Sequence, residues 1–314
     1  MATVDLGVGR VTPSRRSRSS GRRGGRRRVP RVAPYLFVLP NMLAVGLFAI
    51  WPAVNGFRES FFHVIEGQPS RFAGLANYRQ LVTDAQFWAA VRSTLEFVVG
   101  FVALTVVLAT AAALLLQSQR RAKGLFRAAL YVPVLISPVV VGILWNWILN
   151  PTSGVLDALL HRVGLGQPSW LVEPHLAMGS AIFVELWATL GFYTLIVLGG
   201  LQSIDPSLYE AARVDGASSW DEIWRITLPS LRPTLLVVVI LSTITGFQAF
   251  EFIYTLTGGG PLGATTLIVQ YIYDHAFVPP INFGLATAAS VLLFLVLFAI
   301  TLVNLAIGRR KGAA

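Results

Sequence analysis

Two carboxylates stand inside apolar stretches of the chain, where a charge is most costly. Glu185 lies near the middle of the apolar interval between His175 and Gly200, and Glu251 lies in the outer part of a later one. A charged side chain near the middle of a bilayer costs about 2.5–3.5 kcal/mol, so each carboxylate should face protein or a watery cavity. Both are candidates to line a path that binds solute hydroxyl groups. A hydrogen bond to a neighbouring helix, through Ser, Thr or Gln248, is an equal alternative.

The segment that follows Glu251 ends in glycines and a proline. These residues break a helix and free backbone groups, which a membrane tolerates only against protein or water. We therefore extend the candidate path from Gln248 and Glu251 into this segment. The path candidates in this region are Gln248, Glu251, Tyr254, Gly259, Gly260 and Pro261.

A polar stretch from Gln202 to Pro229 interrupts two long apolar runs. Asp205 is suited to cap a first helix, and Pro206 to its first position, where no amide donor is needed. The helix should run to about Asp215 and end at Gly216, which can adopt the left-handed conformation of a C-terminal cap.

Ser219, with Glu222 three residues later, predicts a capping box that begins a second helix, and Pro229 should end that helix. Each helix should gather its apolar residues on one face, leaving Glu210 and Asp215 on the other side. The expected faces are Leu208, Ala211 and Ala212 on the first helix, and Trp220, Ile223, Trp224 and Thr227 on the second. The pattern indicates a docking element for a partner; the alternative is a connector that lies on the membrane.

Other chemistries find no support in the sequence. The chain has no cysteine, its four histidines are scattered without metal-ligand spacing, and it has no Gly-x-x-x-x-Gly-Lys-Ser/Thr phosphate loop. We therefore expect no metal site and no ATP bound by this chain. Only 13% of the residues are charged and 54% are hydrophobic, a composition typical of an integral membrane protein.

The polar stretch resembles a known family signature. Glu-Ala-Ala, three residues, Gly, and then Ile-x-Leu-Pro is similar to the loop of inner-membrane permease subunits of binding-protein-dependent ABC importers. The flanking residues resemble the carbohydrate-uptake branch, with its maltose-type and glycerol-3-phosphate-type permeases, and in particular the first of the two permease subunits. The resemblance extends from about Pro34 to the C-terminus and departs at Asp205 and Glu251, where the family more often has Pro and Asp. The matching loop residues are Glu210, Ala211, Ala212, Asp215, Gly216, Ile226, Leu228 and Pro229.

The resemblance implies an all-α membrane protein that forms half of a translocation pathway. It implies four kinds of partner: the lipid bilayer, a second permease subunit, two cytoplasmic ATPase subunits that carry ATP and Mg²⁺, and an extracytoplasmic solute-binding protein. The loop at residues 201–230 would couple this chain to the ATPase. A proton-coupled secondary carrier is the alternative function, because it would also use intramembrane carboxylates.

Apolar intervals predict six membrane spans, with the loop between the fourth and fifth. Pro133 and Pro138 should kink the third span. The intervals are Tyr35 to Ala53, Phe97 to Gln119, Ala128 to Leu156, His175 to Gly200, Arg232 to Leu256 (including Glu251), and Phe283 to Gly308.

The distribution of basic residues orients these spans. With both termini in the cytoplasm, twenty of the 25 Lys and Arg residues lie on the cytoplasmic side, as the positive-inside rule requires. Residues 1–31 contain ten arginines and should form a disordered cytoplasmic tail, residues 32–308 the permease domain, and residues 309–314 a basic cytoplasmic end. The net charge of +10 does not indicate nucleic acid, because attraction of the tail to anionic lipid explains it better.

Overall fold

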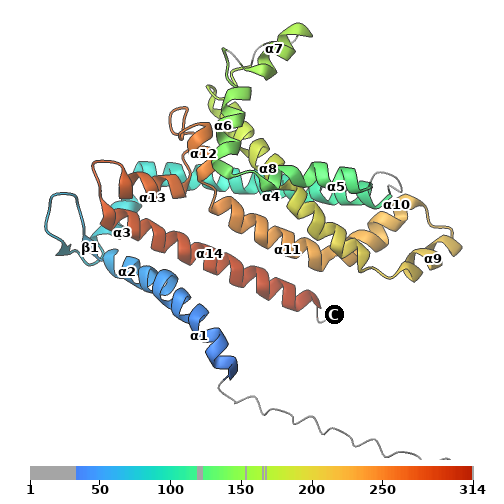
Figure 1. Cartoon of the computed structure of the whole chain (residues 1–314), viewed down its shortest axis with the longest axis horizontal. Helices are drawn as coiled ribbons and strands as arrows, with labels where there is room; N and C mark the ends of the chain where they lie inside the picture. Colours follow the sequence, from blue (N-terminus) through green and yellow to red (C-terminus); the bar gives the residue numbers. More distant parts are fainter. Residues whose placement is uncertain (1–32, 119–122, 153, 165, 167, 313–314) are drawn as a thin grey trace, which may run out of the picture. The chain divides into compact units, whose positions relative to one another are not determined.

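The computed structural model describes residues 33–118, 123–152, 154–164, 166 and 168–312, so the expected arginine tail lies outside the described residues. The chain divides into two compact units, residues 1–51 and 52–314. The described part is almost entirely helical (Figure 1). Five helices are long and apolar enough to cross a membrane, or six if one bent pair is counted as a single span. The predicted all-α class is therefore confirmed, and the predicted six spans agree with the count that takes the bent pair as one span.

The first candidate span consists of α1 (Ala33–Val45), the π-helical η1 (Gly46–Ile50) and α2 (Trp51–Glu59). The helix continues through Pro40, although the sequence predicted punctuation there. The span tested for membrane crossing, Phe37–Glu59, has none of its residues buried within the chain, as expected of a helix whose partner is lipid or another subunit.

The centre of the larger unit is the packing of α4 (Ala85–Ser118) against α8 (Pro174–Gln202). Phe97 and Phe101 of α4 stack with ring centroids 5.9 Å apart, and Phe101 meets Tyr193 of α8 edge-on at 6.3 Å. α11 (Leu228–Phe247) packs against both helices, and α14 (Phe283–Gly312) packs against α11. Figure 1 shows α4, α11 and α14 running side by side. These four helices correspond to the predicted second, fourth, fifth and sixth spans.

The predicted third span is a broken one. α5 (Lys123–Tyr131) and the 3₁₀ turn η2 (Val132–Leu135) meet α6 (Pro138–Ile148) at an angle of 100°. Ser137 precedes Pro138 and is extended, with ψ 136°, because the proline ring disfavours a helical residue before it. The prolines were predicted to kink this span. The observed bend of 100° is sharper than a kink within one continuous helix.

The predicted fifth span is wrong at its outer end. α11 stops at Phe247, Phe250 is non-helical, and Glu251 begins a separate short helix, α12 (Glu251–Leu256). α12 instead packs on α6: Asn146 Nδ2 donates to the carbonyl of Leu256 at 2.6 Å. This contact with another helix directs the chain away from the axis of α11.

Several small elements between the long helices were not predicted. They are the antiparallel strands β1 (Phe62–His63) and β2 (Arg71–Phe72), and the helices α3 (Ala76–Thr83), α7 (Val155–Arg162) and α13 (Ile268–Phe277). Two hydrogen bonds hold α13, one to α4 and one to Asp84, the residue directly before α4. The Thr94 hydroxyl accepts from the Ile268 amide at 2.8 Å, and the Tyr271 hydroxyl donates to Asp84 at 2.6 Å.

Candidate functional site: the coupling loop and the polar path

The first helix of the signature loop, α9 (Pro206–Val214), is capped as predicted. Asp205 Oδ1 accepts from the Ser207 amide at 2.9 Å, and Pro206 occupies the first helical turn. The hydrogen bond from that amide stabilises the carboxylate and lowers the pKa of Asp205. At the other end Gly216 has φ +82°, and the Ala217 amide donates back to Ala212 at 2.9 Å, which is a Schellman cap.

The cap of the second helix differs from the prediction by one residue. Ser218, not Ser219, is the cap: its Oγ accepts from the Asp221 amide at 3.2 Å, and the Asp221 carboxylate accepts from the Ser218 amide at 3.3 Å. Asp221 therefore has the reciprocal role that was predicted for Glu222. Ser and acidic residues are adjacent at both positions, so the sequence offered two registers for the same capping box.

Pro229 does not end the second helix, which corrects the other prediction for this region. α10 (Ser219–Asp221), the π-helical η3 (Glu222–Thr227) and α11 form one continuous helix, Ser219–Phe247, of 29 residues. Pro229 lies in the first turn of α11. The wider turn of the preceding π-helix gives the proline ring room where an α-helical carbonyl would clash, because the two helix types place their carbonyls differently. The signature loop is thus continuous with the fifth span.

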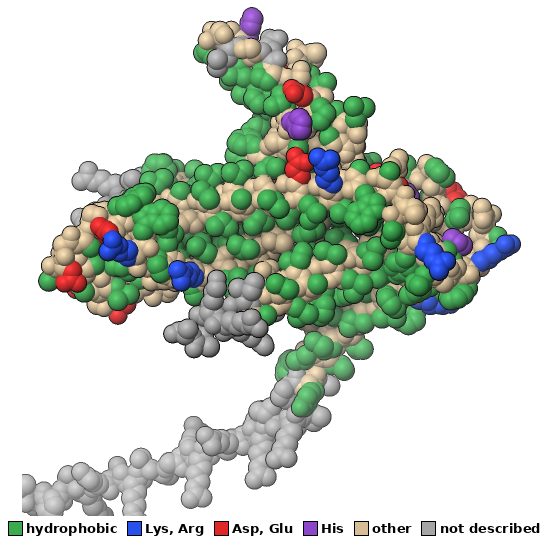
Figure 2. Space-filling view, turned by 180° about the vertical axis from the view of Figure 1, so that it is seen from behind, with side chains coloured by type: hydrophobic (Ala, Val, Ile, Leu, Met, Phe, Trp, Pro, Cys, Tyr) green, Lys and Arg blue, Asp and Glu red, His purple; other side chains and the backbone are tan. Residues whose placement is uncertain are grey.

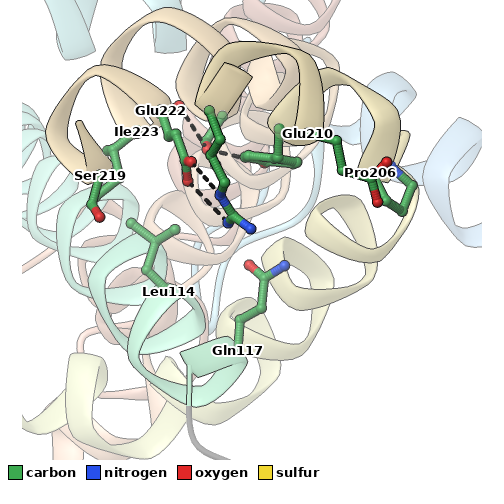
Figure 3. A pocket seen from close by; sticks show the side chains of 10 residues that line it. Leu114, Gln117, Pro206, Glu210, Ser219, Glu222 and Ile223 are labelled. Carbon is green, nitrogen blue, oxygen red and sulfur yellow. Dashed lines mark hydrogen bonds and ion pairs between the residues drawn. The ribbon is translucent and has the colours of Figure 1, made fainter. Parts of the chain in front are cut away.

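A cavity of about 440 Å³ lies between the end of α4 and the signature loop (Figure 3). Three signature-region side chains that meet there are Glu210, Arg213 and Glu222. Arg213 Nε donates to Glu222 Oε1 at 2.8 Å, which joins α9 to η3. The lining residues are Leu114, Gln117, Pro206, Tyr209, Glu210, Arg213, Ser219, Glu222, Ile223 and Thr227.

The apolar face predicted for the second helix is divided in two. Thr227 is buried and Ile223 half-buried beside the cavity, whereas Trp220 and Trp224 are 68% and 55% exposed and contact each other with ring centroids 5.6 Å apart. Exposed aromatic residues of this kind are typical of surfaces that meet a partner or a membrane interface.

Of the eight signature residues, Glu210 alone is among those that line this cavity. On α9 and its cap, Glu210, Ala211, Asp215 and Gly216 are exposed, and Ala212 is half-buried. On the continuous helix the last three are all half-buried: Ile226, Leu228 and Pro229.

The polar path candidates fall into two groups. Gln248, Glu251 and Tyr254 are exposed and follow one another around the break between α11 and α12. Glu185 is 8% exposed within α8, whereas Glu251 is exposed at the start of α12. The two predicted carboxylates therefore differ in burial and belong to different helices.

The Gly-Gly-Pro segment forms a braced turn. Gly259 is buried with φ +88°, and a Cβ there would meet Thr266 and Gln270. The Thr265 hydroxyl donates to the Gly260 carbonyl at 2.6 Å, directly before Pro261. The helix α12 ends before this segment, at Leu256, and Gly258 (φ +61°) donates back to the Ile253 carbonyl at 3.2 Å. The role that the structure supports for Gly259, Gly260 and Pro261 is therefore to form the turn after α12, so the exposed polar surface belongs to the residues before them.

Sequence reasoning missed two side-chain contacts within the loop. Besides the Arg213–Glu222 pair, the Tyr209 hydroxyl lies 3.0 Å from Thr227 Oγ1. Each pair joins residues that are nine or more positions apart and lie on different helices. Helical periodicity relates residues three or four positions apart, so it does not predict these pairs.

Comparison with known proteins identifies the family. Residues 82–312 match the family model described as "Binding-protein-dependent transport system inner membrane component". The trehalose/maltose transport system permease protein MalF of Thermococcus litoralis is 34% identical over 276 residues, covering 88% of this chain and 93% of that protein. The sn-glycerol-3-phosphate transport system permease protein UgpA of Agrobacterium fabrum is 33% identical over 279 residues, covering 86% and 92%.

A solved structure agrees with these relatives. The crystal structure of a bacterial alginate ABC transporter, in complex with an alginate pentasaccharide-bound periplasmic protein, contains a chain that matches with a TM-score of 0.78. That chain is 27% identical, and the match covers 88% of this chain and 94% of that one. Nothing found supports the alternative of a proton-coupled carrier. The chain therefore belongs to the family of inner-membrane components of binding-protein-dependent transport systems, as a permease subunit of an ABC importer.

Proposed function

We propose that this permease subunit forms half of the translocation pathway for a carbohydrate or a related polyhydroxylated solute. The relatives named for trehalose and maltose, glycerol 3-phosphate and alginate support that class, since all of these solutes carry several hydroxyl groups. The exposed carboxylate, amide and phenol of Glu251, Gln248 and Tyr254 are groups that hydrogen-bond such hydroxyls.

The observation that carries the coupling role is the continuity of the signature loop with the fifth span. The helix Ser219–Phe247 begins in the signature loop and ends next to Gln248 and Glu251. Movement imposed on the loop is thereby passed to the polar path as rigid-body motion of a packed helix. ATP and Mg²⁺ belong to the partner ATPase in this proposal, and this chain supplies no catalytic residue.

The complete transporter in this proposal contains four kinds of component. They are this permease, a second permease, two ATPase subunits on the side of the signature loop, and an extracytoplasmic binding protein. The alginate transporter solved with its periplasmic protein supports the last of these. Both termini lie in the cytoplasm in this arrangement, and the protein resides in the inner membrane.

Glu210 is the residue through which we expect the ATPase to dock. It is exposed on α9 and faces the cavity of Figure 3. A basic group of the ATPase would pair with this carboxylate, so Glu210→Lys turns an attraction into a repulsion between like charges. We expect the variant to insert normally and to co-purify with less ATPase, and Glu210→Gln to have an intermediate effect. Equal co-purification of all three proteins would contradict this docking role.

The function itself is tested in vesicles that contain the assembled transporter purified with this chain. Uptake should require ATP on the side of the signature loop and the binding protein on the other side. It should also continue when the proton gradient is dissipated at constant ATP. Uptake that follows the proton gradient and ignores ATP would instead establish a secondary carrier.

A further inference from the structure

The helix α9 carries the signature residues, yet apolar burial does not hold it in place. None of its residues is buried, and Leu208 is half exposed although apolar. The cavity of about 440 Å³ separates its inner side from the end of α4. The orientation of α9 on the continuous helix therefore depends on its terminal caps and on polar contacts.

The first polar contact is the ion pair between Arg213 and Glu222. Arg213 Nε lies 2.8 Å from Glu222 Oε1 and Nη2 lies 3.5 Å from Oε2, so the guanidinium approaches the carboxylate with two nitrogens (Figure 3). The Glu222 side chain is only 14% exposed, against 66% for Arg213. The hydrogen bond to Glu222, followed by its charge, raises the pKa of Arg213. The pair is therefore an oriented contact with one partner largely removed from solvent.

The second contact ends on the same residue of η3. Thr227 Oγ1 donates to the carbonyl of Glu222 at 3.0 Å and lies 3.0 Å from the Tyr209 hydroxyl. Since the threonine hydroxyl gives its single proton to that carbonyl, Tyr209 is the donor to Thr227. Thr227 is buried, so its loss of a partner would be costly. Tyr209 and Arg213 lie one turn apart on α9. Arg213 contacts the Glu222 side chain directly, and Tyr209 is linked through Thr227 to the Glu222 carbonyl.

The continuous helix Ser219–Phe247 connects these contacts to the polar path at its other end. At 1.5 Å per residue, its 29 residues extend about 43 Å from the signature loop to the break before Glu251. A force applied to α9 reaches this helix through the two contacts and the short turn at Gly216. If α9 pivots about that turn, the helix does not follow.

We propose that the pairs Arg213–Glu222 and Tyr209–Thr227 form a clamp that makes α9 and the fifth span one rigid body. The four side chains are positioning residues for the coupling of ATP hydrolysis to transport, and their role rests on the proposed function. Without the clamp the ATPase would still bind and hydrolyse ATP, while fewer cycles would move the fifth span.

A second ion pair in the same segment provides a matched control. Arg225 Nε lies 3.2 Å from Asp221 Oδ1, four residues earlier on the same helix. This ion pair connects no second helix, and the Arg225 side chain is 81% exposed. Loss of the pair should therefore leave the clamp intact. Arg225→Gln therefore removes an ion pair of similar chemistry without the proposed effect.

The test compares Arg213→Glu, Glu222→Arg, the double exchange, and Arg225→Gln in the assembled transporter. We expect ATP hydrolysed per solute imported to rise about two- to tenfold in each single variant, the range for losing one partly exposed charged hydrogen bond. The double exchange should return the ratio towards the wild-type value, and Arg225→Gln should not change it. A merely structural defect would lower the amount of complex and leave this ratio unchanged.

A distance measurement tests the clamp independently of transport. The chain has no cysteine, so spin labels at Ser207→Cys and Ser230→Cys report the distance between α9 and α11. We expect a broader distance distribution in the single variants and in Tyr209→Phe, and a narrow one in the double exchange. Unchanged coupling and distances in the single variants would overturn the clamp. The clamp would also be overturned if the double exchange restored neither the coupling nor the distances and the ATPase no longer co-purified. Arg213 would then contact the ATPase directly. A wild-type complex with no ATP-dependent uptake but with the expected distances would overturn the proposed function instead.

Discussion

At Gly216 the backbone conformation, rather than a lack of space, disfavours most side chains. Its φ is +82°, and a Cβ built there would meet no heavy atom within 4 Å. A left-handed conformation costs an L-residue roughly 1–2 kcal/mol, and most for a β-branched one. A residue that avoids the left-handed region therefore changes the direction in which α9 leads into α10, without a clash that neighbours must relieve.

This predicts different outcomes for two substitutions at the same position. Gly216→Val should assemble and reach the membrane but use more ATP per solute imported, because α9 is tilted. Gly216→Asn should behave nearly as wild type, since Asn accepts the left-handed region at little cost. Simultaneous measurement of uptake and ATP hydrolysis in vesicles decides this. A Val variant that couples as well as the Asn variant would show that the angle at this turn is unimportant.

Glu251 is the second residue whose environment sets a clear expectation. It is exposed at the start of α12, where its carboxylate can accept hydrogen bonds from solute hydroxyls. Glu251→Gln should keep substantial uptake because an amide also forms hydrogen bonds, whereas Glu251→Leu should lose most of it. Initial uptake rates at low solute concentration are the measurement. An inactive Gln variant, together with wild-type uptake that collapses with the proton gradient at constant ATP, would favour charge transfer by the carboxylate.

Among the elements, the contact between α6 and α12 determines the outer end of the fifth span. Gly142 of α6 lies so close to α12 that a Cβ would collide with Thr255 Oγ1 and the Phe252 carbonyl. The Thr255 hydroxyl lies 3.3 Å from the Val139 carbonyl. The second half of the broken third span and the separate α12 are thus packed closely against each other.

Gly142→Ala should therefore lower stability by about 1–3 kcal/mol, the usual result of adding atoms to a packed interface. Gly179→Ala in α8 is the matched control, because no atom lies within 4 Å of its Cβ position. It should be neutral or raise stability by roughly 0.5–1 kcal/mol, since alanine favours a helix. Thermal unfolding of the purified protein in detergent measures both. Equal melting temperatures would contradict a close contact at Gly142.

An element could be predicted from the sequence when the residues that determine it are close together in the chain, and was missed when contacts with another helix determine it. Asp205 and Gly216 were predicted as caps because capping depends on residues within one turn. The four long spans follow from apolar runs that a bilayer requires. The end of α11 at Phe247 and the passage of the helix through Pro229 were missed, because contacts with α6 and a π-helical turn decide them. The Arg213–Glu222 pair was missed for the same reason: its partners belong to different helices.

On the scale of the whole molecule, apolar side chains cover most of the face seen in Figure 2, with few charged ones among them. Many are large and exposed on the spans, including Val99 and Val107 of α4 and Phe294 and Phe298 of α14. In water such a surface would favour aggregation, so it suits a helix bundle that lies in a lipid bilayer.

The orientation of these spans is the last prediction, and it rests on charge. Twenty of the 25 Lys and Arg residues lie on the side of the termini and the signature loop if the chain crosses the membrane six times. This includes counting the bent pair Gly124–Leu135 and Pro138–Ile148 as one span. Thr152→Cys, after α6, should then react with an impermeant thiol reagent on intact cells, and Ser219→Cys should react only after permeabilisation. Both positions are exposed and the chain has no other cysteine, so accessibility reports the side of the membrane alone. The reverse pattern would place the signature loop outside, either because the orientation is inverted or because the bent pair enters and leaves on one side. Labelling of both positions in intact cells would mean that α8, the one candidate span between them, does not cross the membrane.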